Sequence, residues 1–359
     1  MTLDEVVASI RPADAGAMRA AMGRQQRLTK PPGSLGRLED VAIQLAGVFG
    51  CERPIARATT LIVAAADHGV VEQGVTGYPQ AVTAQMVLNF LAGGAAINVM
   101  ARTRGVDLVI VDAGVAAPLP EHPDLRVVAA GRGTADMTRG PAMTRVQAED
   151  CISAGVGIAL DAAEAGAHVI ATGDMGIGNT TAASAIAAAL TGNPPGLTTG
   201  RGTGRSDPEL QHKIACVEQS LDVNQPDAND GIDVLRTVGG FEIGVLAGVV
   251  LGGALAGRAV VLDGFISGAA GLIAHSLCPT VVDYMIAGHR SAEPGHEFAL
   301  YHLGLQPVLD LDMRLGEGTG ALLAAGLVEV AAACLSDMAT FDEAGVSDRD
   351  PEGSAEVSA

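Results

Sequence analysis

The sequence predicts an α/β fold in three layers, with a mainly parallel sheet and a small helical domain formed by both chain ends. Three observations predict it. Short apolar runs recur along the chain and end in small or acidic residues, Ala- and Leu-rich stretches lie between them, and neither chain end shows a strand pattern. Alternating strands and helices are typical of layered α/β proteins.

Five apolar runs are the expected strands, because continuous apolar runs of this length fit strands that are buried on both faces. They are Thr60–Ala65, Asp107–Val111, His168–Ala171, Ala259–Leu262 and Thr280–Ile286. Each leads into a cluster that contains Gly, Asp or His. In a Rossmann-like sheet, ligands bind beyond the carboxyl ends of the strands, so the clusters indicate one shared site.

Four stretches between the strands have the length and composition of helices: Val82–Arg102, Arg145–Gly166, Thr180–Leu190 and Phe241–Ala256. Towards the chain ends, residues 1–28 predict one or two amphipathic helices. Val308–Ser336 predicts a helix interrupted by a loop at Gly316–Gly320.

The expected domains follow from these patterns. We expect an α/β domain over residues 29–305 and a small helical domain made of 1–28 and 306–336, with Glu317 in the loop of the second segment. Residues 337–359 are polar and acidic without periodicity, which predicts a disordered tail.

Composition excludes several classes of protein. The 359 residues carry 22 Lys and Arg against 41 Asp and Glu, and the net charge of −19 disfavours a broad electrostatic grip on nucleic acid or an anionic membrane. The N-terminus lacks the apolar core of a signal peptide, and no uncharged apolar stretch free of glycine reaches the ~18 residues of a membrane span. We expect a cytoplasmic protein with small-molecule partners and reduced, scattered cysteines.

The segment Thr172–Thr181 (TGDMGIGNTT) is the first candidate for binding chemistry. It lies between an expected strand and an expected helix. Its glycines allow a ligand close to the backbone, and a helix N-terminus offers unpaired N–H groups to an anion. The pattern is equally compatible with an ordinary turn before a capped helix.

A second Gly-rich loop, Thr199–Arg205 (TGRGTGR), holds two of the scarce arginines, and Lys213 follows it. Backbone amides with Arg201, Arg205 and Lys213 can bind a phosphate locally, against the overall negative charge. A solvated loop is the competing interpretation.

Two further segments carry chemistry. In Arg314–Gly320 (RLGEGTG), Glu317 stands between two glycines, and a carboxylate in a narrow, partly desolvated loop can act as a general base. An exposed loop Glu is the alternative. In Gly74–Gln85, Tyr78 is one of three tyrosines in the chain and can form a slot for a flat ring with Pro79 and Met86, or be a half-buried turn residue.

The histidines do not indicate a metal site. His289 and His296 flank a short loop with a spacing unlike that of zinc ligands, and the other six histidines are dispersed. The chain also lacks a Gly-x-Ser-x-Gly segment, which argues against an α/β-hydrolase.

Taken together, these segments resemble the nicotinate-nucleotide–dimethylbenzimidazole phosphoribosyltransferases of cobalamin lower-ligand assembly. The resemblance covers roughly residues 28–335 and rests on nine blocks in order: Lys30–Gly36, Ala66–Val70, Tyr78–Met86, Asn89–Ile97, Asp174–Thr181, Gly200–Gly204, Gly239–Gly244, His289–Gly295 and Leu315–Gly320.

The resemblance implies a glycosyltransferase, more narrowly a pentosyltransferase. A benzimidazole nitrogen displaces nicotinate from nicotinate mononucleotide, and the product is α-ribazole 5′-phosphate. No metal or redox cofactor is implied, and the family is expected to form homodimers.

The resemblance also implies roles for particular residues. Glu317 is the expected base, and Asp174 stands where the family usually has Glu, near the ribose and the leaving pyridine. The expected benzimidazole slot is formed by Tyr78, Pro79, Met86 and Leu315. The expected nucleotide and phosphate side is formed by Gly176, Gly178, Gly202, Gly204, Lys213 and Ser291.

Two other functions compete with this one. A nucleotide-dependent oxidoreductase needs a glycine fingerprint and an acidic residue about 20 residues later, and this arrangement is absent around Gly173–Gly178. A non-catalytic nucleotide-binding or sensor protein on the same fold is the second alternative. Such a binder has no need for Glu317 in a ring slot.

Overall fold

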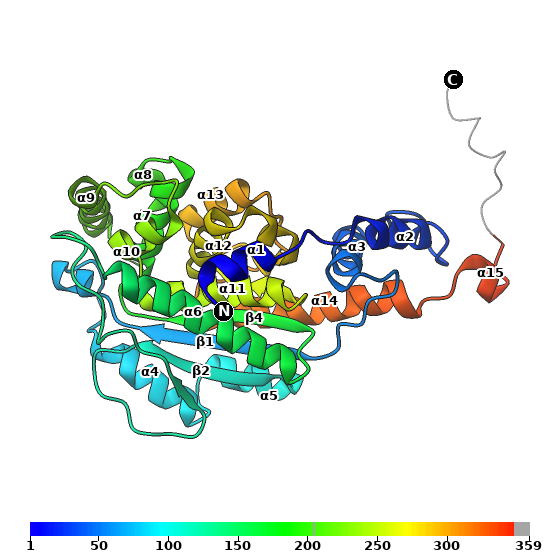
Figure 1. Ribbon diagram of the computed structural model, residues 1–359, viewed down its shortest axis with the longest axis horizontal. Coiled ribbons are helices and arrows are strands. Elements are labelled where there is room, and N and C mark those ends of the chain that lie inside the picture. Colours follow the sequence, from blue (N-terminus) through cyan, green and yellow to red (C-terminus); the bar gives the residue numbers. More distant parts are fainter. Residues whose placement is uncertain (203, 205, 348–359) are drawn as a thin grey trace. The chain divides into compact units, whose positions relative to one another are not determined.

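The structure is a computed structural model that describes residues 1–202, 204 and 206–347. It divides into two compact units. The large unit consists of Met1–Pro12 and Arg57–Gly326, and the small unit of Ala13–Ala56 and the described residues from Leu327 on. Figure 1 shows the elements in the order of the chain.

The core of the large unit is a parallel sheet in the order β3-β2-β1-β4-β5-β6. This is the order of a doubly wound fold, and its direction of winding changes between β1 and β4. The strands are β1 (Thr59–Ala66), β2 (Asp107–Gly114), β3 (Leu125–Val127), β4 (Val169–Met175), β5 (Ala259–Leu262) and β6 (Met285–Ala287). Every residue of β1 and β5 is buried, which explains their continuous apolar sequences.

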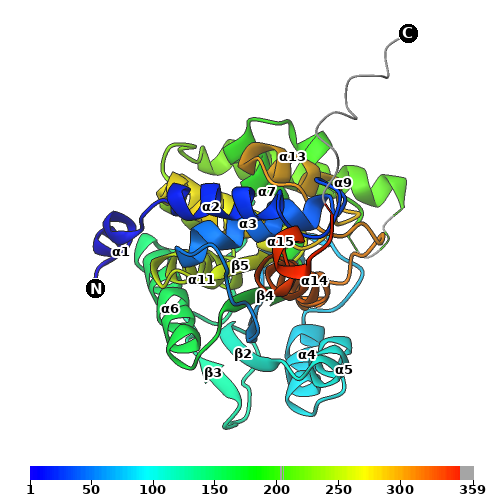
Figure 2. The ribbon, with the colours of Figure 1, turned by 90° about the vertical axis from the view of Figure 1, so that its right-hand side faces the viewer.

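Helices cover both faces of this sheet (Figure 2), as the predicted three-layer fold requires. On one face α11 (Phe241–Leu255) packs on the strands and α6 (Arg145–Glu164) packs on α11. The other face carries α4 (Ala81–Leu91) and α5 (Ala96–Arg104). The remaining helices of this unit are α1 (Leu3–Ser9), η1 (Gly69–Gln73), α7 (Asn179–Thr191), α8 (Pro195–Thr198), α9 (Asp207–Asn224), α10 (Gly231–Val238), α12 (Phe265–Leu277), η2 (Pro279–Tyr284) and α13 (Pro294–Leu303).

Glycines allow the close contact between α6 and α11. A Cβ on Gly155 would lie 1.9 Å from the Val245 carbonyl oxygen, and one on Gly248 would lie 2.0 Å from the Ile152 carbonyl oxygen. Both backbones therefore touch directly, which accounts for a core rich in Gly and Ala and poor in aromatic residues.

Four of the five predicted strands are confirmed, and the fifth is wrong. Thr280–Ile286 is mostly the 3₁₀ helix η2, which Pro279 opens, and the strand that follows it pairs over Met285–Ala287 alone. A proline fits the first turn of a helix, because an N–H group at that position would have no acceptor within the helix. The three-residue strand β3 was not predicted, because so short a segment carries no pattern.

Two predicted helices differ from the structure. Val82–Arg102 is divided into α4 and α5 at Gly93, whose φ of +76° a helix does not allow. Residues 308–315 form no helix; Leu309 instead forms a β-bridge with His289. The helix α14 (Thr319–Asp337) begins only after the Glu317 loop and runs through both units.

The small unit is helical and is built from both chain ends. It contains α2 (Ala15–Gln25), α3 (Arg37–Phe49), the last part of α14 and α15 (Phe341–Ala344). Buried Arg24 donates from Nε to the Leu335 carbonyl oxygen at 2.7 Å, which fastens α2 to α14. Buried Lys30 pairs with Glu39 at 2.7 Å.

The boundaries between the units differ from those expected. Helix α1 packs on α6 and α11 and so belongs to the large unit, whereas α3 belongs to the small one. The Glu317 loop is part of the large unit. The expected tail begins in ordered structure, since a capping box of Thr340 and Glu343 starts α15; residues 348–359 lie outside the described residues.

By length and composition, Ala81–Arg104 and Thr319–Asp337 are apolar enough to cross a membrane. Core helices of globular proteins share these properties. The first segment is broken at Gly93, and Leu322, Ala325 and Val328 of the second are buried inside the protein.

Candidate active site

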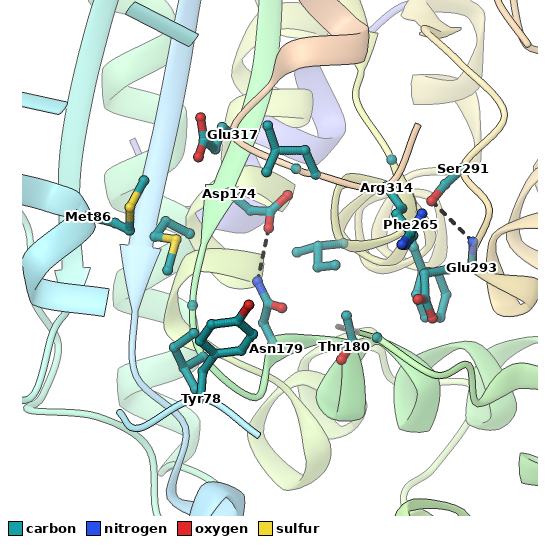
Figure 3. Close-up of a pocket in the computed structure, with 18 of the residues that line it drawn as sticks. Tyr78, Met86, Asp174, Asn179, Thr180, Phe265, Ser291, Glu293, Arg314 and Glu317 are labelled. Atoms are coloured by element: carbon teal, nitrogen blue, oxygen red, sulfur yellow. Dashed lines mark hydrogen bonds between the residues drawn. The ribbon is translucent and has the colours of Figure 1, made fainter. Parts of the chain in front are cut away.

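A cavity of about 680 Å³ opens beyond the carboxyl ends of the strands. Its walls come from the end of β4 and the start of α7, the segments after β5 and β6, the loop before α14, and the segment that leads into α4. This is the place that a doubly wound sheet offers to a ligand, next to the β1–β4 boundary. Figure 3 shows the side chains that line it.

Asp174 stands near the centre of the cavity, close to the end of strand β4, where it pairs with Ala64 of β1. Its side chain is buried, and its Oδ2 accepts a hydrogen bond from Asn179 Nδ2 at 2.9 Å. Burial raises the pKa of Asp174 well above its ordinary value, and the nearby charges of Asp263 and Glu242 raise it further. The surroundings of Asp174 therefore favour its protonated form more than water does.

The turn after Asp174 is shaped by glycine and by a threonine of α4. A Cβ on Gly176 would lie 2.6 Å from the Ala66 carbonyl oxygen, so the turn rests on the end of β1. Gly178 has a φ of +95° and immediately precedes α7. The Ile177 N–H donates to Thr83 Oγ1 at 3.1 Å, which fixes the turn between the two glycines.

Glu317 lies in a loop whose backbone is left-handed at three successive residues. The φ angles of Gly316, Glu317 and Gly318 are +84°, +60° and +85°. The Glu317 N–H donates to the Asp174 carbonyl oxygen at 3.1 Å. Its carboxylate is buried, and Oε2 accepts from the Ile97 N–H at 3.4 Å. Burial raises the pKa of Glu317, which suits a group that exchanges a proton.

Asp263, which follows β5, holds this loop in place. Its carboxylate oxygens accept from the Gly318 N–H at 3.2 Å and the Ala321 N–H at 2.9 Å, and it is fully buried. His289 Nε2 lies 3.7 Å from Asp263 Oδ1. The sequence prediction did not single out Asp263, although the Asp-Gly pair at the end of an expected strand was a signal for it.

One side of the cavity is mainly apolar. Figure 3 shows Tyr78 and Met86 there, and Val82, Ile177 and Leu315 are further apolar residues of the lining. Tyr78 and Leu315 are 51% and 58% exposed, so the cavity is open to solvent at these two residues.

The opposite side carries polar groups around one aromatic ring. Figure 3 shows Thr180, Ser291, Glu293 and Arg314 there with Phe265, and Gly202 also lines the cavity. The Ser291 N–H donates to His296 Nδ1 at 3.0 Å, and Ser291 Oγ accepts from the Glu293 N–H at 3.3 Å. Burial lowers the pKa of His296 to about 3, so its ring is neutral and accepts this bond.

Lys213 is buried directly behind this polar side. Its Nζ donates to Thr180 Oγ1 at 2.8 Å and to the Gly200 carbonyl oxygen at 3.2 Å. A Cβ on Gly202 would lie 3.4 Å from the same Nζ.

The structure brings most of the predicted site residues together. Eight of them line the cavity: Tyr78, Met86, Asp174, Gly176, Gly202, Ser291, Leu315 and Glu317. Among the described residues, four lie outside this lining: Pro79, Gly178, Gly204, which lines a neighbouring hollow of about 440 Å³, and Lys213. Arg205 lies outside the described residues.

The sequence prediction gave no role to several residues of the cavity, among them Phe265, His289, Glu293 and Arg314. Phe265 follows β5, and His289 and Glu293 follow β6, the strand for which the predicted bounds were wrong. In the part of the chain that the structure describes, no group of three or more His, Cys, Asp or Glu side chains is placed to hold a metal ion.

The doubly wound sheet and its cavity define an α/β protein with a ligand site at the topological switch point. Residues 10–346 match the protein family described as phosphoribosyltransferase. The chain belongs to this family, and within it to the nicotinate-nucleotide–dimethylbenzimidazole phosphoribosyltransferases.

Three relatives support this membership. The protein of that name from Roseiflexus sp. (strain RS-1) is 56% identical over 345 residues, which cover 96% of this chain and 98% of the relative. The one from Chloroflexus aggregans is 55% identical over 347 residues, which cover 97% and 98%. The crystal structure of the enzyme from Thermus thermophilus matches with a TM-score of 0.89 and 47% identity, over 94% of this chain and 100% of that one.

Proposed function

We propose that the protein transfers the phosphoribosyl group of nicotinate mononucleotide to 5,6-dimethylbenzimidazole. The products are α-ribazole 5′-phosphate and nicotinate, for the assembly of the cobalamin nucleotide loop. The observation that carries this proposal is the order of groups along one cavity. Figure 3 shows Met86 at one side, Glu317 and Asp174 beside each other further in, and Ser291 and Arg314 at the opposite side.

The apolar side suits the flat incoming ring. Tyr78, Met86 and Leu315 offer ring and aliphatic surface without competing charges. One benzimidazole nitrogen attacks the ribosyl C1′ and forms the new bond. The proton on its other nitrogen becomes acidic at that moment, and Glu317 accepts it. Burial supports this role because it raises the affinity of the carboxylate for a proton.

In this proposal Asp174 faces the ribose. The bond between C1′ and the nicotinate nitrogen breaks, its electron pair stays on the pyridine ring, and C1′ gains positive character. A pyridinium ring departs without a strong acid, so the site needs alignment of two rings more than acid catalysis. Asp174, fixed by Asn179, supplies a carboxyl group beside C1′ and the ribose hydroxyls.

The polar side suits the 5′-phosphate. The backbone of Gly176 and Gly202 and the hydroxyl of Ser291 line it, and Lys213 lies behind Thr180. Gly178 and Gly204 shape the two loops through their positive φ angles. A single monoester can be bound in this way despite the net charge of −19, because the contacts are local.

The competing function, a non-catalytic nucleotide-binding or sensor protein, lacks support of this kind. Relatives named as this enzyme match nearly the whole chain, and the buried Glu317 has no evident purpose in a binder. We also propose a homodimer in the cytoplasm, as the family resemblance implies. Sedimentation equilibrium of the purified protein tests the dimer.

The proposed activity is tested by incubating the protein with nicotinate mononucleotide and 5,6-dimethylbenzimidazole. Mass analysis should detect α-ribazole 5′-phosphate and an equal amount of nicotinate. Parallel incubations with another benzimidazole, adenine and a phenol show which base is preferred. Absence of a ribotide with every base would reject the proposal.

A further inference from the structure

A buried, hydrogen-bonded pair of side chains, His68 and Glu242, has no role in the mechanism above. His68 Nε2 and Glu242 Oε1 are 2.6 Å apart, and the side chains are 1% and 0% exposed. His68 follows strand β1, and Glu242 stands in the first turn of α11. The pair thus ties the end of the central strand to the helix that covers the sheet.

The pair lies directly against the turn that follows β4. A Cβ on Gly176 would lie 3.0 Å from Glu242 Oε1, and one on Gly178 would lie 3.4 Å from the His68 Cβ. Gly240 approaches the pair as well, because a Cβ there would lie 2.4 Å from His68 Cε1 and 2.6 Å from Glu242 Oε2. The backbone of the turn therefore rests on these two side chains.

Burial of Glu242 costs free energy that a purely structural role does not require. Its Oε2 has no hydrogen-bond partner in the described part of the chain. After burial and Asp263, the charge of Glu242 is the next cause that raises the pKa of Asp174. An apolar side chain would fill the same space without an unsatisfied oxygen. The contact with the turn gives a reason for the polar pair.

We propose that His68 and Glu242 are positioning residues of the nucleotide site, and that their hydrogen bond fixes the turn Gly176–Gly178 against which nicotinate mononucleotide binds. This inference rests on the proposed function. Neither side chain lines the described cavity, so the pair acts through the turn. Tyr78, Met86 and Leu315 of the base slot lie outside this turn, and only Ile177 belongs to it, so loss of the pair weakens nucleotide binding more than base binding.

Binding measurements on the full chain test this selectivity. We would compare Glu242→Gln, His68→Gln and the double variant with the wild type, by calorimetric titration with nicotinate mononucleotide and, separately, with 5,6-dimethylbenzimidazole. Each single variant should bind the nucleotide roughly 10-fold more weakly, a misplacement effect, and should lose clearly less affinity for the base. The double variant should lose no more nucleotide affinity than the more affected single variant, because the two single substitutions remove the same hydrogen bond.

The matched control is Asp112→Asn. Asp112 is also a buried carboxylate near the end of a strand, accepts from the Gly114 and Val115 N–H groups at 3.0 and 2.8 Å, and does not line the cavity. This substitution should lower the melting temperature and leave the affinities for the nucleotide and for the base unchanged. If a variant of the pair does not fold, Gly240→Ala displaces the pair without altering any residue of the turn and should cause the same selective loss.

Two results would overturn the inference: unchanged nucleotide affinity in the folded variants, or an equal loss of nucleotide and base affinity. A wild-type protein that neither binds nicotinate mononucleotide nor forms a ribotide would instead reject the proposed function. The two failures are therefore distinguishable.

Discussion

The two carboxylates of the cavity are held in opposite ways. Asp174 belongs to strand β4, its backbone is in register with β1, and Asn179 fixes its side chain. Glu317 belongs to a loop, has a left-handed backbone with a φ of +60°, and makes a long hydrogen bond to Ile97. One group is placed by regular secondary structure and the other by tertiary contacts.

This difference shows that the backbone strain of the site lies at Glu317. A non-glycine residue in the left-handed region costs about 1–3 kcal/mol and persists where surrounding structure determines it. Asp263 supplies that structure through hydrogen bonds to Gly318 and Ala321, and Gly173 supplies space for the loop. The proposed base is thus more dependent on distant residues than the carboxyl group proposed to face the ribose.

The largest expected effect is that of Glu317→Gln. The amide cannot accept the benzimidazole proton, so kcat should fall roughly 10²–10⁴-fold, while nicotinate mononucleotide still binds. Steady-state kinetics and calorimetry measure the two quantities. The exposed Glu164→Gln serves as control and should behave as wild type; near-normal turnover of the Glu317 variant would remove it from the base role.

The next effect is expected for Gly173→Ala. A Cβ there would lie 2.6 Å from the Glu317 carbonyl oxygen and 2.7 Å from the Gly318 nitrogen, and backbone atoms must then move. We expect kcat to fall by about 10²-fold through misplacement of Glu317. Gly157→Ala in α6 is the matched control, since no atom outside its own stretch of helix lies within 4 Å of the Cβ that this substitution would add. It should leave activity intact, and equal activity of both variants would contradict the strained-loop argument.

Asp174→Asn should separate function from stability. Loss of the contact between the carboxyl group and the ribose should raise KM for nicotinate mononucleotide roughly 10-fold. Because burial and nearby acids raise the pKa of Asp174, its contribution to stability is complete below the ordinary Asp pKa and is lost as pH rises through the raised pKa. Asn does not ionise, so the Asn variant does not lose stability in this way as pH rises.

Thermal unfolding at several pH values measures this second effect. The melting temperature of Asp174→Asn should exceed that of the wild type increasingly as pH rises. A variant less stable than the wild type at alkaline pH would show that Asn179 and the charge matter more than burial.

The smallest expected effect is a displaced pH profile. Burial is the main cause that raises the pKa of Glu317, the charge of Asp263 adds to it, and the hydrogen bond from the Ile97 N–H lowers it. Since the ionised form accepts the proton, kcat should begin to fall at a higher pH than for an ordinary Glu as pH decreases. Glu317→Gln should not show this fall of kcat at low pH. A fall of wild-type kcat at or below the ordinary pKa range of Glu would contradict the buried-base interpretation.

Much of the fold was predictable because burial on both faces leaves continuous apolar runs. Thr59–Ala66 and Ala259–Leu262 show this clearly. The prediction was wrong at Thr280–Ile286, where an equally apolar run begins with Pro279 and forms a 3₁₀ helix. Local composition did not distinguish these two outcomes.

The site was predictable where a motif combined glycine with a chemical group. Asp174 and Glu317 fall in such motifs and meet in the cavity. Asp263, Glu242 and His68 lie in segments that the prediction noted but received no role of their own, because their importance depends on partners far away in the sequence, such as Gly318 for Asp263. A single sequence does not show such partners.

The dependence of Glu317 on late-arriving contacts has a consequence for how the protein is made. Strand β1 pairs with β4, whose residues follow it by about a hundred positions, and the Glu317 loop binds to Asp174 of β4 and to Asp263, which follows β5. Contacts between distant segments form slowly. During synthesis β1 and β4 can therefore pair first, and the proposed base joins Asp174 only after β5 and β6 have been made.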